Sequence, residues 1–137
     1  MLQVHASEVQ GSAHVRTMAW TAVLLFVVVE GATRLFDLYR RVPSVDIPIH
    51  FLSGVAVTAV LLLVFSRTGR ALAARWSIWG NGVVALTWEA LEAIDEVVTP
   101  DPPHLQDVFW WDGFGDVGAA LAGGLALLWL VRRVGGP

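Results

Sequence analysis

The chain has 137 residues, 55% of them hydrophobic and only 15% charged, and its formal net charge is −3. This length fits one domain, and the composition excludes an ordinary soluble domain and indicates a membrane protein. The chain has no cysteine, which excludes a disulfide framework, thiolate metal ligands and cysteine catalysis. The acidic balance and the lack of a basic run argue against nucleic acid as a partner.

Residues 1–17 show no clear hydrophobic period, and we expect an N-terminal tail there. The first transmembrane span is predicted over about 18–39, close to the roughly 20 residues that cross a bilayer core. Within it, Glu30, Arg34 and Asp37 share a stripe at i, i+4 and i+7, which must face protein or water. This stripe is either an ion pair that keeps the helix end hydrated or part of a functional site.

The second span is predicted over about 48–66, because Pro48 suits the first turn of a helix. Asp46 and His50 are four residues apart and therefore lie on one helix face. A histidine alone in an apolar helix is usually a hydrogen-bonded structural residue. A carboxylate one turn away makes His50 a better candidate for a metal ligand or a base.

The third and fourth spans are predicted over about 77–98 and 108–131, separated by a proline-rich loop that cannot be helical throughout. Each span carries a pair of acids on one face. The pairs are Glu89 with Glu92 and Asp112 with Asp116.

We therefore predict an all-α polytopic membrane protein in which residues 18–134 form a bundle of four transmembrane helices. A compact soluble helical bundle is the competing interpretation. With both termini inside, six arginines fall on the inner side and two, Arg40 and Arg41, on the outer side, which is the positive-inside pattern. The six are Arg16, Arg67, Arg70, Arg75, Arg132 and Arg133. We expect a multi-pass protein of the inner (cytoplasmic) membrane, surrounded by the lipid bilayer.

In this topology every span places acids at the outer side, so we expect a shared polar chamber there. A carboxylate in mid-bilayer costs about 2.5–3.5 kcal/mol on insertion scales. Seven acids beside one arginine and one histidine must therefore be partly protonated, hydrated, or neutralised by a cation. The seven are Glu30, Asp37, Asp46, Glu89, Glu92, Asp112 and Asp116. With oxygen donors and one imidazole, the cation would be divalent, such as Mg²⁺, Mn²⁺, Zn²⁺ or Fe²⁺.

Three motifs carry a resemblance to known proteins. They are Asp46-Ile-Pro-Ile-His50-Phe-Leu-Ser-Gly54, Trp88-Glu-Ala-Leu-Glu92 and Trp111-Asp-Gly-Phe-Gly-Asp116. Together they resemble the YjdF-like family of bacterial inner-membrane proteins and, more distantly, VanZ-like proteins. The resemblance covers roughly residues 43–131 and implies that the polar positions of the motifs form the site. It implies no particular reaction, because that family has no established activity. The chain departs from the family in being shorter and in having glycine at positions 113 and 115.

Three functions fit these features. The first is a metal-dependent enzyme that acts on a phosphorylated or lipid-linked envelope molecule. Its metal ligands would be His50, Glu89, Asp112 and Asp116; Glu92 or Asp46 would be the general base and Arg34 the phosphate-binding residue. The second is ion or proton transport, with homo-oligomer formation left open because four spans are few for a carrier. The third is a structural or interaction protein with a buried polar network.

Overall fold

The computed structural model describes the backbone of residues 2–42, 44–98 and 109–134, and the side chains of residues 13, 15–39, 41–42, 44–95, 98 and 113–133. Every regular element within these residues is helical, as the sequence predicted. The elements are α1 (Leu2–Leu35), α2 (Leu38–Arg41), α3 (Asp46–Val64), the 3₁₀-helix η1 (Ser66–Thr68), α4 (Arg70–Val98) and α5 (Phe109–Val134).

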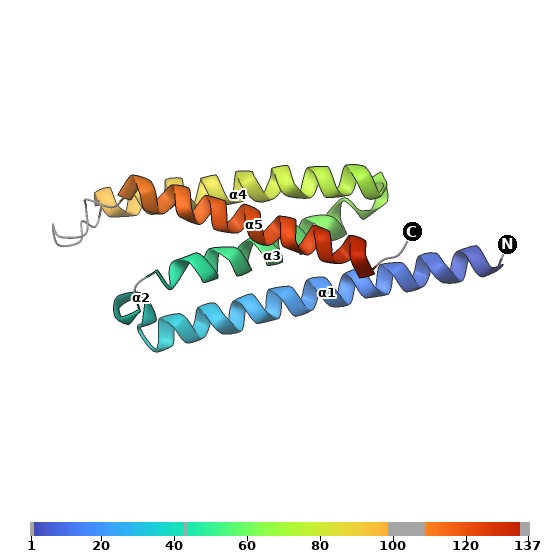
Figure 1. Ribbon diagram of the computed structural model, residues 1–137, viewed down its shortest axis with the longest axis horizontal. Coiled ribbons are helices and arrows are strands. Elements are labelled where there is room, and N and C mark those ends of the chain that lie inside the picture. The colour runs from blue at the N-terminus through green and yellow to red at the C-terminus, as the bar shows by residue number, and fades with distance from the viewer. Residues whose placement is uncertain (1, 43, 99–108, 135–137) are drawn as a thin grey trace.

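Four long helices lie side by side and alternate in direction along the chain (Figure 1). The first residues of α1 and the last residues of α5 lie at the same end, and α2 lies at the opposite end. Helix α3 packs against α1, α4 and α5, and α4 also packs against α5. The bundle is thus organised around α3.

Helix α1 differs at both ends from the span predicted over 18–39. It begins at Leu2, because the segment before residue 18 contains no proline and is rich in residues that favour a helix. It ends at Leu35, because Asp37 adopts the left-handed conformation with φ 53°. Aspartate tolerates this conformation better than most residues. The short helix α2 follows the break.

Helix α3 begins at Asp46, within two residues of the prediction. Pro48 sits in its first turn, where a backbone N–H would have no partner inside the helix. Asp46 lies in the same turn, where a negative charge interacts favourably with the helix dipole.

Glycines let α3 and α5 approach until their backbones touch. A Cβ atom added to Gly54 of α3 would collide with the backbone carbonyl of Ala120, and one added to Gly123 of α5 would collide with that of Phe51. Small residues at helix interfaces commonly allow such approach within membranes.

Polar side chains tie α4 into the same interface. The amide Nδ2 of Asn81 donates a hydrogen bond of 2.9 Å to the carbonyl oxygen of Ala120 on α5. Ser77 hydrogen-bonds the Ala73 carbonyl within α4. Asn81, Ser77 and Thr58 are almost completely buried. Backbone contacts and the hydrogen bond from Asn81 to Ala120 therefore close the middle of the bundle.

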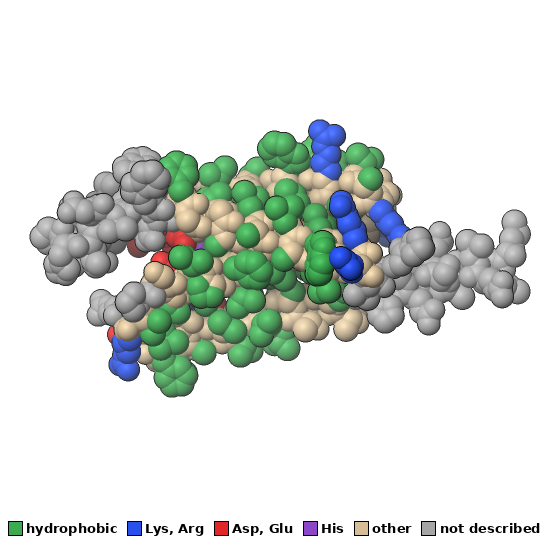
Figure 2. Space-filling view, in the orientation of Figure 1, with side chains coloured by type: hydrophobic (Ala, Val, Ile, Leu, Met, Phe, Trp, Pro, Cys, Tyr) green, Lys and Arg blue, Asp and Glu red, His purple; other side chains and the backbone are tan. Residues whose placement is uncertain are grey.

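Three of the four predicted spans are long and apolar enough to cross a membrane, namely Val15–Leu35, Asp46–Val64 and Gly113–Arg133. Many large apolar side chains on the bundle surface are exposed, as expected for a surface that faces lipid (Figure 2). Helix α4 does not meet the same test. Its uncharged stretch Trp76–Trp88 rises only about 20 Å, whereas a hydrocarbon core is about 30 Å thick.

Candidate functional site

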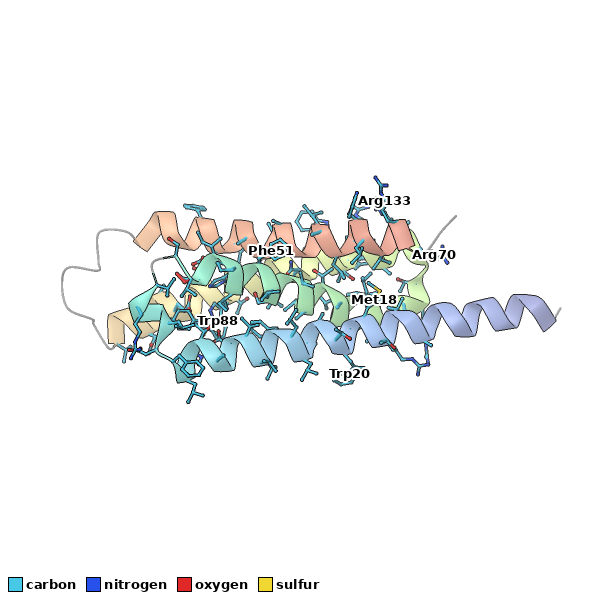
Figure 3. The ribbon with its side chains drawn as sticks, turned by 60° about the horizontal axis from the view of Figure 1, so that its bottom comes forward. Met18, Trp20, Phe51, Arg70, Trp88 and Arg133 are labelled. Atoms are coloured by element: carbon cyan, nitrogen blue, oxygen red, sulfur yellow. The ribbon has the colours of Figure 1, made fainter. Side chains whose placement is uncertain are left out.

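Charged side chains separate between the two ends of the bundle (Figure 2). Acidic and histidine side chains gather at the end where α2 lies, and most arginines lie at the other end. Figure 3 shows the same polarity, with Phe51 and Trp88 in the acidic half and Arg70 and Arg133 at the opposite end. The end at which α2 lies is called the acidic end below.

His50 occupies the centre of this end, between carboxylates from two other helices. Its Nδ1 lies 3.9 Å from Oε1 of Glu89 on α4, and its Nε2 lies 3.7 Å from Oδ2 of Asp116 on α5. The side chains of all three residues are largely buried. Both distances exceed those of N–H···O hydrogen bonds, which are about 2.7–3.2 Å. Each ring nitrogen thus faces a carboxylate without touching it.

A group with the composition of a metal site includes His50 and Glu89, the carboxylate that faces Nδ1. His50, Glu89 and Glu92 each offer one ligand atom, and these atoms all lie within 4.8 Å of one another. Glu89 and Glu92 reach the same place because they are three residues apart on α4. Around a divalent ion with bonds of about 2.0–2.2 Å, ligand atoms lie roughly 3–4 Å apart. Small side-chain movements would therefore bring the three residues to bonding distance.

Gly113, at the start of α5, gives the Glu89 carboxylate its room. A Cβ atom at position 113 would lie 2.8 Å from Oε2 of Glu89. A side chain at position 113 would therefore press against a candidate ligand. Because Gly113 has no side chain, the Glu89 carboxylate can occupy this space.

A second polar unit borders the group from α1 and α2. The Glu30 carboxylate accepts hydrogen bonds from Nε of Arg34 and from the hydroxyl of Tyr39. Burial and the hydrogen bond to Glu30 raise the pKa of Tyr39 above its ordinary value. Arg34 lies within electrostatic range of Glu92, and Tyr39 within range of Asp46. The unit formed by Glu30, Arg34 and Tyr39 is called the Glu30 unit below.

The structure thus gathers most of the predicted site residues at one end, although it does not test their roles. His50, Glu89, Glu92 and Asp116 come together, Asp46 lies one turn before His50 on α3, and Arg34 lies near Glu92. The predicted stripe of three charges on α1 is interrupted, because Asp37 falls beyond the end of the helix. The side chain of Asp112, a predicted metal ligand, lies outside the described residues.

Sequence reasoning missed two residues of this region. Tyr39 was taken only as the end of the first span, although it is the single tyrosine of the chain and stands nine residues after Glu30. That spacing is not a helical repeat, so the contact depends on the break after Leu35. Gly113 was noticed as unusual, but its contact with Glu89 required the packing of α4 against α5.

Comparison with known proteins identifies a family. Residues 8–136 match the family described as "Predicted membrane protein (DUF2238)". No significant match is found among curated proteins or among solved structures. The match supports the membrane character that the resemblance implied, but it does not support the YjdF-like or VanZ-like name. The chain belongs to the DUF2238 family of predicted membrane proteins.

Proposed function

We propose that this integral membrane protein binds a divalent metal ion at its acidic end through His50, Glu89 and Glu92. The observation that carries the proposal is the convergence of one imidazole and two carboxylates, from two helices, with ligand atoms within 4.8 Å of one another. Mixed nitrogen and oxygen donors suit Mn²⁺, Fe²⁺ or Zn²⁺ better than Ca²⁺. Three protein ligands leave coordination positions for water or a substrate.

Asp116 acts in this proposal as a positioning residue. It faces Nε2 of His50, whereas Glu89 faces Nδ1. A metal on Nδ1 leaves the proton on Nε2, where Asp116 can accept a hydrogen bond and orient the ring. Histidine ligands commonly have such a carboxylate or carbonyl partner.

The proposal includes α4 as a fourth span. Helix α4 runs beside α3 and α5 through the length of the bundle (Figure 1), and its buried polar side chains face those helices and not lipid. The arginine-rich end would lie in the cytoplasm by the positive-inside rule. Both termini are then inside, and the metal site opens toward the outer face of a cytoplasmic membrane.

A metal-dependent hydrolytic enzyme is one way to use this site. The ion would activate water and polarise a phosphoryl or carbonyl oxygen. Because Glu92 belongs to the ligand group, Asp46 is the carboxylate best placed to serve as general base. Metal binding itself is the firmer part of the proposal, because it requires only the convergence of the three ligands.

Transport through the monomer is less well supported. A carboxylate on each side of His50 would suit a proton relay. Just inside the cluster, however, Gly54 contacts the Ala120 backbone and Gly123 contacts the Phe51 backbone. These contacts close the α3–α5 interface at two points, which favours a site open to one side over a path through the monomer.

Titration of purified, metal-stripped protein with Mn²⁺ tests the proposal, with binding followed by calorimetry and by the paramagnetic signal of the ion. We expect one Mn²⁺ per chain. His50→Ala and Glu89→Gln should each weaken binding more than ~100-fold, and Asp116→Asn by about 10–100-fold through loss of ring orientation.

Asp95→Asn is the matched control, because Asp95 is an exposed acid on α4 one turn beyond Glu92. It should bind Mn²⁺ like the wild type. A wild-type protein that binds neither Mn²⁺ nor Zn²⁺, or a His50→Ala protein that binds as tightly as the wild type, would overturn the proposal.

A further inference from the structure

Glu30 and Tyr39 contact the guanidinium of Arg34. Its Nε donates to Glu30, and its Cζ lies 5.9 Å from the ring centroid of Tyr39, whose hydroxyl donates to the same carboxylate. Glu30 is mostly buried, whereas the Arg34 side chain is 65% exposed. One edge of the guanidinium is therefore anchored and the rest of it faces outward.

The outward edge of the guanidinium carries unused donors. A guanidinium has five N–H groups in a planar fork. Within the described residues, the terminal nitrogens of Arg34 donate to no protein acceptor. An arginine needed only for the ion pair with Glu30 could do without the aromatic contact and the exposed fork. An arginine anchored in this way is oriented for bidentate binding of an oxyanion.

Exposed apolar side chains and a candidate metal ligand both lie in the neighbourhood of Arg34. Leu35 and Phe36 before α2 and Val42 after it are exposed apolar side chains. Such residues at the end of a span lie at the level of lipid head groups. Arg34 also lies within electrostatic range of Glu92, a candidate metal ligand.

We infer that Arg34 and the metal ion together bind the phosphate group of a phosphate ester. The inference rests on the proposed metal site, because the carboxylates of the acidic end would repel a phosphate if no cation neutralised them. The guanidinium fork takes two phosphate oxygens, and an open coordination position of the metal takes another. Phosphate and metal must then strengthen each other's binding by the same factor.

Coupling is measured by titrating metal-stripped protein with Mn²⁺ in the absence and presence of glycerol 3-phosphate. In the wild type the phosphate ester should tighten Mn²⁺ binding about tenfold, a typical size for coupled ligands. In Arg34→Gln, Mn²⁺ alone should still bind but the tightening should disappear. Arg34→Lys keeps the charge and loses the fork, so it should retain only part of the tightening.

Arg133→Gln is the matched control. Arg133 also lies over an aromatic ring, 5.0 Å from the centroid of Trp129, but at the opposite end of the bundle (Figure 3). Its replacement should leave the coupling intact. Thermal unfolding of each variant shows whether loss of the Glu30 ion pair has disturbed the fold, and Arg34→Lys keeps the test decisive if Arg34→Gln is unstable.

A second arm separates a soluble ester from a lipid. Mn²⁺ is titrated into protein in nanodiscs of phosphatidylglycerol and into protein in a glycoside detergent that lacks phosphate. Coupling with glycerol 3-phosphate in detergent indicates a soluble ester, and coupling only in phosphatidylglycerol indicates a lipid head group. Both results support the inference.

Mn²⁺ binding that neither phosphate source changes, or that both sources change equally in Arg34→Gln and wild type, overturns the inference and leaves the metal site standing. Failure of Mn²⁺ to bind the wild-type protein under any condition overturns both.

Discussion

The middle of the bundle and its acidic end are built by the same three helices in opposite ways. In the middle, α3 and α5 touch at Gly54 and Ala120, and Asn81 donates a 2.9 Å hydrogen bond to Ala120 across the interface. About one helical turn away, His50 stands 3.7 and 3.9 Å from two carboxylates, beyond hydrogen-bonding distance. The contacts in the middle hold the helices in place, whereas at the acidic end His50 is separated from both carboxylates. Such spacing costs stability, and it fits a region kept for a ligand.

The first prediction concerns the middle of the bundle, where a substitution should lower stability most. Gly54→Ala places a methyl group against the Ala120 carbonyl, and neither backbone can move without separating α3 from α5. Overpacking of this kind costs about 1–3 kcal/mol, and we expect the upper part of that range. Thermal unfolding in detergent, followed by tryptophan fluorescence, measures the loss.

Gly118→Ala provides the comparison for this substitution. Gly118 is also within a helix, but nothing lies within 4 Å of the position that its Cβ would take. The change should be neutral or stabilise the helix by up to about 1 kcal/mol through propensity. Equal stability of the two variants would show that the backbone contact between α3 and α5 is not as close as described.

The second prediction concerns the hydrogen bond that closes the middle. Asn81→Ala removes the hydrogen bond that the Asn81 side chain of α4 donates to the Ala120 carbonyl of α5. Interhelical hydrogen bonds in membranes are worth about 0.6 kcal/mol on average and ~1.7 kcal/mol at most. We expect a loss of stability in this range, measured by unfolding in mixed micelles, with Mn²⁺ affinity unchanged.

Thr87→Ala is the control for Asn81→Ala, because the exposed Thr87 hydroxyl only bonds the Val83 carbonyl of its own helix. Its effect should stay within about 0.5 kcal/mol. If Asn81→Ala weakened Mn²⁺ binding as strongly as Asp116→Asn, the division between a closed middle and a ligand-binding end would be wrong.

The sequence predicts the gathering of His50, Glu89 and Asp116 because two simple rules suffice. Helical spacing places the acids of each pair on one face. Short connections make successive helices antiparallel neighbours, so the end of one helix lies beside the start of the next. These rules predict at which end of the bundle the residues gather. They do not fix the distances between side chains, and the roles of these residues stay predictions.

The parts that escaped prediction depend on packing or on a backbone break. Gly54 was visible as a small residue, but its contact with the Ala120 backbone depends on how closely α3 and α5 approach. The hydrogen bond from Asn81 to Ala120 likewise depends on how α4 packs against α5. The left-handed Asp37 has no sequence signature, and without it Tyr39 could not turn back to Glu30.

The last prediction tests the Glu30 unit, whose effect on stability should be the smallest. Burial and the hydrogen bond to Glu30 raise the pKa of Tyr39, so the folded protein holds the phenolic proton more tightly than the unfolded chain. The contribution of Tyr39 to stability is therefore complete below about pH 10, the ordinary tyrosine pKa. It is lost as the pH rises through the higher pKa of the folded state.

Because Tyr39 is the single tyrosine, the ultraviolet absorbance of tyrosinate reports its titration alone. Glu30→Gln removes the charged acceptor and should lower the midpoint, while Asp37→Asn, which changes an exposed neighbouring acid, should leave it in place. A midpoint that is unaffected by Glu30→Gln would mean that burial alone protects the phenol. Tyr39 would then be no part of the unit that orients Arg34, and the phosphate-binding role of that arginine would lose its structural basis.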